Sequence, residues 1–153
     1  MAHIHDLIDF TVSAFIVHED KILLVHHIKL NKWLQIGGHV ELDEDTDQAL
    51  MREIKEECGL KVEVLSDLCP CEPDAQTTPL LRPHFLNIHW VSNTHRHCDL
   101  GYVCRAITAE PKLEEEGAYA IGWFTKEQLE ELDTVPNLRQ LATKALEIAA
   151  KAR

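Results

Sequence analysis

The sequence predicts an α+β domain in which a mixed β-sheet core is sandwiched by helices, an α/β/α arrangement. Three observations support this prediction. Strand-like segments outnumber helical ones, the first two strand-like segments flank a short polar turn, and two helical segments each have one apolar side. The chain has 153 residues, of which 45% are hydrophobic, so its length suits one domain with an ordinary core. We therefore expect residues 1–153 to form a single domain.

A β-hairpin opens the predicted domain. β-Branched and apolar residues dominate segments 11–17 and 22–28, and the polar segment 18–21 separates them. Segment 69–83 contains four prolines and has little periodicity, so we expect a long loop there. Later strand candidates, which are mostly apolar or alternate apolar with polar residues, are 62–64, 86–90, 101–106 and 119–124.

The main helix is predicted over about residues 46–58, and Gly59 is placed to end it, as glycine often is just past a helix. One side of this helix is apolar: Leu50, Met51, Ile54 and Cys58. Thr125 and Gln128 have the spacing of a capping box, which predicts a short helix after them. A last helix has one apolar face: Leu138, Leu141, Ala145 and Ile148.

The composition excludes several classes of partner. The chain has 15 Lys and Arg against 26 Asp and Glu, a formal net charge of −11. This balance argues against binding to duplex nucleic acid or to an anionic membrane, because both attract clustered basic residues. The longest apolar runs are far shorter than the roughly 20 residues that a membrane-spanning helix needs. Five cysteines, an odd number, and no charged-then-apolar leader favour a reduced, cytoplasmic setting.

Three carboxylates share one side of the main predicted helix. Glu53, Glu56 and Glu57 fall within about 100° around its axis, where like charges cost a few tenths of a kcal/mol per pair. A hard divalent cation would compensate, because Mg²⁺ binds carboxylate oxygens and shares its other positions with water and phosphate. An isolated E-x-x-E-E is more often a solvated acidic face. The flanking residues therefore decide the interpretation.

Those flanking residues complete a longer pattern, G-x5-E-x7-R-E-U-x-E-E-x-G-U, in which U is bulky and apolar. Ile54 and Leu60 fill the two U positions. A chance match of the seven fixed residues has a probability on the order of one in a million or less. The sequence resembles the Nudix hydrolases, the MutT-like family, and the preceding hairpin, Trp33 and Trp123 extend the likeness. The fixed residues are Gly38, Glu44, Arg52, Glu53, Glu56, Glu57 and Gly59.

The resemblance implies the Nudix fold and a hydrolytic activity. Members of the family cleave a diphosphate linkage in a nucleoside diphosphate joined to another group, by metal-assisted attack of water on phosphorus. The implied cofactor is Mg²⁺, with Mn²⁺ as a substitute, and the implied partner is a small nucleotide or nucleotide-like diphosphate. Residues that mark particular substrates in the family are missing, so the substrate-binding residues are unassigned. The resemblance leaves open whether the protein forms a homodimer.

The resemblance also implies roles for the box residues. Gly38 is expected to offer its main-chain carbonyl to the metal, and Glu44 and Gly59 are expected to support the box. Arg52 is expected to orient a carboxylate by a charge-assisted pair. We therefore expect Arg52 and Glu53 to be catalytic residues. The expected metal ligands are Gly38, Glu53, Glu56 and Glu57.

The general base is expected in a later acidic segment. Family members often draw it from the box helix or from a later loop, and Glu116, or its neighbour Glu115, occupies such a place. A solvated acidic turn is an equal alternative for this segment, because blocks of like charge usually face water. Glu116 is our choice as a further catalytic residue.

Three other interpretations remain open. The chain would be a non-catalytic nucleotide-binding or sensing module of the Nudix fold if nucleotides bind without turnover. An isomerase of isoprenoid diphosphates shares the fold but lacks support, because no catalytic cysteine segment is recognisable. A zinc site formed by Cys69, Cys71, His95, His97 and Cys98 suits tetrahedral Zn²⁺ in ligand type but not in spacing, so we favour structural thiols and histidines.

Overall fold

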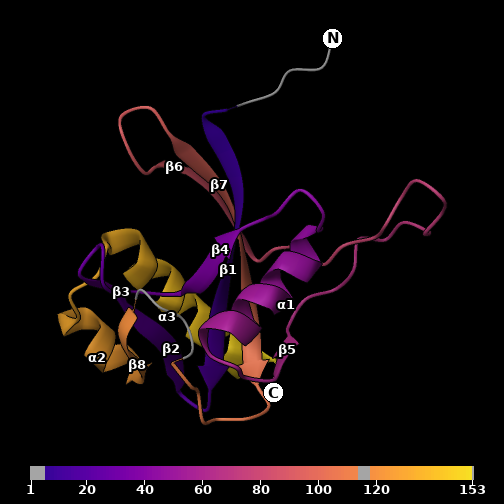
Figure 1. Ribbon diagram of the computed structural model, residues 1–153. Coiled ribbons are helices and arrows are strands. Elements are labelled where there is room, and N and C mark those ends of the chain that lie inside the picture. Colours follow the sequence, from indigo (N-terminus) through magenta and orange to yellow (C-terminus); the bar gives the residue numbers. More distant parts are fainter. Residues whose placement is uncertain (1–5, 114–117, 153) are drawn as a thin grey trace.

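The computed structural model describes residues 6–113 and 118–152 of the chain. It contains an eight-stranded mixed sheet with α1 (Thr46–Glu57) on one face and α2 (Lys126–Glu131) and α3 (Pro136–Lys151) on the other (Figure 1). The predicted α/β/α arrangement is confirmed. The strands are β1 (Ile8–His18), β2 (Lys21–His27), β3 (Lys32–Leu34), β4 (Ile36–His39), β5 (Val62–Val64), β6 (Phe85–Trp90), β7 (Arg96–Ala106) and β8 (Ala118–Thr125).

Strand β1 is the centre of the sheet. It pairs in parallel with β7 from Ile8 to Val17 and antiparallel with β4 and β2 along its opposite edge. Because successive side chains of a strand point to opposite faces, β1 contributes to two cores. Val12 and Ala14 are buried in the core with α1, whereas Phe15 is buried in the core with α3.

Helix α1 begins and ends as its sequence dictates. Asp45 and Gln48 form a capping box at its start. At its end Gly59 adopts φ 66°, the left-handed conformation that glycine tolerates, and its N–H donates to the carbonyl of Ile54. The predicted apolar side is wrong at Met51, which is 43% exposed. Met51 lies at the edge of the apolar arc, about 160° from Glu53, so the sheet does not cover it.

The later strands match the predicted segments, and β6 and β7 are longer than expected. Figure 1 shows that the β6–β7 hairpin and the start of β1 extend beyond the helices. The predicted loop between β5 and β6 projects from the opposite side and is irregular apart from an isolated bridge between Leu68 and Leu81. One backbone group links the base of this loop to α1. The Leu81 N–H donates to both carboxylate oxygens of Asp47 at 3.2 Å.

Candidate active site

Two glycines in β4 allow close approaches, Gly37 to the neighbouring strand β1 and Gly38 to α1. A Cβ on Gly37 would lie well under 3.0 Å from the carbonyl oxygen of Val12, a separation that side chains do not adopt. A Cβ on Gly38 would overlap the carboxylate of Glu53 in the same way. Glu53 is itself only 8% exposed. The missing side chain of Gly38 therefore creates the space in which the Glu53 carboxylate lies.

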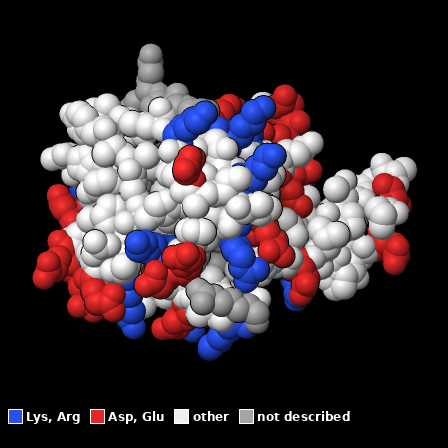
Figure 2. Space-filling view, turned by 90° about the horizontal axis from the view of Figure 1, so that it is seen from below, with Lys and Arg blue, Asp and Glu red and all other residues white. Residues whose placement is uncertain are grey.

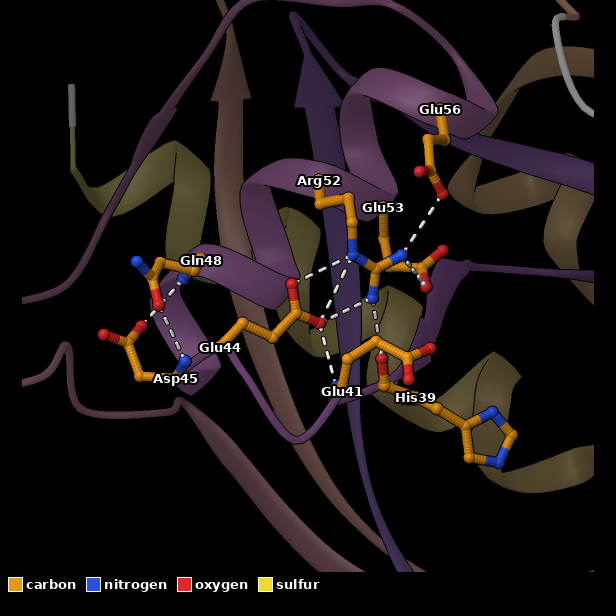
Figure 3. Close-up of polar contacts among 8 residues, drawn as sticks. All are labelled: His39, Glu41, Glu44, Asp45, Gln48, Arg52, Glu53 and Glu56. Atoms are coloured by element: carbon orange, nitrogen blue, oxygen red, sulfur yellow. Dashed lines mark hydrogen bonds and ion pairs between the residues drawn. The ribbon is translucent and has the colours of Figure 1, made fainter.

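Arg52 holds the acidic residues of the site together (Figure 3). Its Nη1 donates to Glu53 Oε1 at 2.9 Å and to Glu56 Oε2 at 3.1 Å. Its Nη2 donates to Glu44 Oε1 at 2.6 Å and to the carbonyl oxygen of His39 at 2.9 Å. One guanidinium thus joins the loop before α1, the end of β4 and the exposed side of α1, which fixes the direction of each carboxylate.

The same contacts shift the pKa values of Glu44 and Arg52. The hydrogen bond from Arg52 is the main cause that lowers the pKa of Glu44, and a hydrogen bond from the Glu41 N–H adds to it. The hydrogen bonds to Glu44 and Glu53 raise the pKa of Arg52. Both groups are therefore ionised at neutral pH, and the pair persists as a charge-assisted contact.

Glu57 lies at the end of α1 and faces the glycine pair. Its Oε2 accepts a hydrogen bond from the backbone N–H of Gly37 at 3.2 Å. A cavity of about 350 Å³ opens beside it, with Gly38, Glu53 and Glu57 in its wall and Val25 among its apolar residues. This volume falls within the range of about 300–1,000 Å³ that is typical of small-molecule sites. The site thus combines a concave space with buried and half-buried carboxylates.

The structure brings some of the predicted site residues to this cavity and not others. Gly38, Glu53 and Glu57 line it, whereas the Glu56 side chain is 51% exposed and reaches the site through Arg52. Within residues 6–113 and 118–152, the three helix carboxylates do not gather within 4.8 Å of one another. Glu116 lies outside the described residues.

The donors that are present suit Mg²⁺. They are carboxylate oxygens, and Mg²⁺ is usually held through one or two carboxylates while it keeps several waters. Such a hydrated ion does not require three carboxylates in direct contact with each other. The space that Gly38 leaves beside the Glu53 carboxylate also suits the binding of a cation there.

Comparison with known proteins identifies the family. A model of the NUDIX domain matches residues 8–145. The chain belongs to the NUDIX family. A NUDIX-family hydrolase from Clostridium perfringens is similar to this Nudix hydrolase, with 32% identity and a TM-score of 0.79 over 92% of this chain and 97% of that chain.

Two further solved structures are similar to this Nudix hydrolase. A MutT NUDIX hydrolase from Burkholderia pseudomallei has 25% identity and a TM-score of 0.65, over 93% of this chain and 98% of that chain. A C. elegans Ap4A hydrolase has 16% identity and a TM-score of 0.73, over 94% of this chain and 98% of that chain. The second likeness shows the fold alone.

Sequence reasoning missed the main-chain groups of this Nudix hydrolase that complete the site. The carbonyl of His39 and the N–H of Gly37 hold Arg52 and Glu57, respectively. A pattern of side chains does not reveal backbone donors and acceptors. The sequence offered one signal, since Gly37 and His39 are the neighbours of Gly38, the first residue of the box. The zinc site considered from the sequence, which combined cysteines with histidines, is not assembled. Cys69 and Cys71 are exposed in the projecting loop, whereas His97 lies in β7.

Proposed function

We propose that this protein is a Mg²⁺-dependent pyrophosphohydrolase that cleaves a diphosphate linkage in a nucleoside diphosphate joined to another group. One observation carries the proposal: Arg52 holds Glu53 and Glu56 in fixed directions beside a cavity into which Glu53 and Glu57 open. This arrangement supplies oxygen ligands for a divalent cation at the wall of a ligand-sized space. Mn²⁺ is expected to substitute for Mg²⁺.

Each residue of the site has a task in the proposed reaction. Glu53, Glu56, Glu57 and the main-chain carbonyl of Gly38 would hold the cation. When bound, Mg²⁺ would neutralise charge on the diphosphate and make an attacking water more acidic. Arg52 keeps the Glu53 carboxylate oriented, while Glu44 and Gly59 fix the two ends of the segment that presents it.

We assign the general base to Glu116. As a new O–P bond forms, the bridging P–O bond breaks, and Glu116 accepts the proton that the attacking water loses. Leu113 and Ala118, the described residues on either side of its segment, both line the cavity, which supports this assignment. Glu116→Gln is expected to lower kcat and to remove one limb of the pH–rate profile.

The substrate is proposed to be a small nucleotide or nucleotide-like diphosphate. The cavity volume, which falls in the range typical of small-molecule sites, supports a ligand of this size. On the face that Figure 2 shows, basic side chains are scattered among acidic ones, and the net charge of −11 likewise does not favour duplex nucleic acid. None of the helices within residues 6–113 and 118–152 is long and apolar enough to cross a membrane. The homodimer stays a prediction.

A panel assay tests the proposed activity. Wild-type protein with Mg²⁺ is incubated with nucleoside triphosphates, nucleotide sugars, ADP-ribose and dinucleoside polyphosphates, and released phosphate, pyrophosphate and mononucleotides are measured. Glu57→Gln should lower kcat by about 100-fold or more on the substrate found, because it removes a charged ligand of the cation. The matched control is Glu147→Gln on α3, which should leave kcat unchanged, because this carboxylate pairs with Lys144 and does not line the cavity.

The result can also contradict the proposal. No hydrolysis across the panel, with nucleotide binding retained in calorimetry, would instead favour the non-catalytic sensing module. An equal decrease of kcat in Glu57→Gln and Glu147→Gln would show that the carboxylate of Glu57 on α1 has no special part in the reaction.

A further inference from the structure

A second group of side chains of the kinds that bind metals lies at the extended end of the sheet, and none of its members belongs to α1. Its His97 lines one cavity together with Glu57 of α1. The register pairs Asp9 of β1 with His97 of β7, and His97 with His89 of β6. Side chains at paired positions lie on the same face of a sheet. His95 directly precedes β7, and its contact with Asp9 places its ring on the same side. Strand pairing, rather than sequence proximity, brings these residues together.

One carboxylate oxygen is the focus of this group. Oδ2 of Asp9 lies 2.6 Å from Nε2 of His95, 3.2 Å from Nε2 of His39 and 4.0 Å from Nε2 of His97. The ligand atoms of Asp9, His95 and His97 all lie within 4.8 Å of one another. Within the described part of the chain, no other set of His, Cys, Asp and Glu side chains meets this condition.

The group is half-buried at the surface of the sheet. The side chains of Asp9, His95 and His97 are 39%, 27% and 20% exposed, so a cation could enter from solvent and still be partly enclosed. The hydrogen bond from His95 holds the pKa of Asp9 below its usual value, so its carboxylate is charged. Burial lowers the pKa of His97.

We propose that Asp9, His95 and His97 form a binding site for Zn²⁺ that is separate from the carboxylate site of α1. Two imidazoles and one carboxylate are a ligand set that Zn²⁺ accepts, whereas Mg²⁺ prefers oxygen ligands alone. Bonds of about 2.0–2.2 Å in a tetrahedral site place ligand atoms roughly 3.3 Å apart. The three atoms reach that spacing by side-chain shifts of about 1 Å.

His39 is the nearest candidate for a fourth ligand. Its Nε2 faces the same oxygen of Asp9, and its ring lies 4.9 Å from that of His97. Figure 3 shows its imidazole directed away from Arg52 and the acidic residues. Because Asp9, His39 and His97 belong to β1, β4 and β7, the bound ion would link three strands near the point where the β6–β7 hairpin leaves the body of the protein.

Calorimetric titration with Zn²⁺ in excess Mg²⁺ tests the site, because the Mg²⁺ occupies the oxygen ligands of α1. The expected stoichiometry is one Zn²⁺ per chain. The double variant His95→Ala/His97→Ala should weaken Zn²⁺ binding by about 100-fold or more. The matched control is His18→Ala, a half-exposed histidine at the opposite end of β1, which should bind Zn²⁺ as the wild type does. Zn²⁺ should also raise the Tm of the wild type but not of the double variant.

Two further variants keep the test decisive. His95→Gln/His97→Gln retains polar side chains at both positions, and its folding is checked by circular dichroism without metal. Glu53→Gln/Glu57→Gln removes carboxylates of α1 and should still bind Zn²⁺. Unchanged Zn²⁺ affinity in a folded His95/His97 variant would overturn the proposal. Loss of Zn²⁺ binding in Glu53→Gln/Glu57→Gln, or stoichiometric displacement of Zn²⁺ by Mg²⁺, would place the ion at α1 instead and would also overturn it.

Discussion

Gly38 is the residue at which a missing side chain matters most to the proposed chemistry. Glycine is often chosen for its backbone freedom, but here the atoms around it give a different reason. The Glu53 carboxylate occupies the position of the absent Cβ, and Arg52 holds that carboxylate from the other side at 2.9 Å. The position of one carboxylate thus depends on two residues, one in β4 and one in α1.

Gly38→Ala is therefore expected to reduce activity more than stability. The new methyl group would push the Glu53 carboxylate away from its place, since the carboxylate can rotate while the backbone of β4 is fixed by its pairing with β1. We expect kcat/KM on the substrate found in the panel to fall by at least about tenfold, equivalent to about 1.4 kcal/mol of transition-state stabilisation.

The control for this substitution is Gly122→Ala in β8. A Cβ there would meet the ring of Phe124 at 3.5 Å, an ordinary contact, and it lies outside the site. Steady-state kinetics and urea unfolding of both variants make the comparison. A Gly38→Ala enzyme with normal kcat/KM would contradict the view that this glycine makes room for Glu53.

At the scale of elements, two helices carry the same capping box in different surroundings. Asp45 and Gln48 cap α1, which presents the acidic residues, and Thr125 and Gln128 cap α2, which lies on the other face of the sheet. Their hydrogen bonds are alike, between the side chain of each residue and the backbone N–H of the other. Comparing the two helices therefore separates the general effect of losing a helix cap from the effect of losing the cap of the helix that carries the site.

Asp45→Ala and Thr125→Ala should each lower the free energy of unfolding by about 1 kcal/mol. Only Asp45→Ala should also lower kcat/KM, because fraying of the first turn of α1 loosens Asp47 and the backbone that follows Glu44. Urea unfolding and steady-state kinetics on both variants test this. Equal effects of the two substitutions on kcat/KM would mean that the start of α1 does not position the site.

The elements differ in how well their sequence predicts them. Residues 46–58 were predicted as a helix because their apolar spacing and Gly59 indicate one, and α1 covers 46–57. Strands β3 and β4 were missed, since they have three and four residues and β4 contains both glycines of the pair. Short strands of this kind are stabilised by their neighbours rather than by their own propensity.

The two proposed metal sites also differ in how far the sequence predicts them. The residues of the carboxylate site fall in one segment of 23 residues, so their spacing alone indicates a common purpose. Asp9 and His95, by contrast, are 86 positions apart and meet because β1 and β7 pair in parallel. A local pattern holds no information on such pairing, so this contact required the three-dimensional structure.

At the scale of the whole molecule, the net charge of −11 is concentrated around the site. Residues 38–60 contain eight acidic and two basic residues. The fold neutralises part of this charge internally, since Arg52 contacts Glu44, Glu53 and Glu56. The remaining field still opposes an anionic ligand, so binding of a nucleotide should depend on the cation that lies between the two sets of negative charge.

This dependence predicts an unusual response to salt. A methylene-bridged nucleoside diphosphate, which resists cleavage, should bind weakly in EDTA at low ionic strength, and NaCl should strengthen its binding by screening repulsion over about 10 Å. In saturating Mg²⁺ the binding should be tighter, and NaCl should no longer strengthen it. The uncharged nucleoside is the control ligand and should show no salt dependence in either buffer. Calorimetry measures all four cases, and tight nucleotide binding in EDTA at low salt would show that basic groups, rather than a cation, receive the diphosphate.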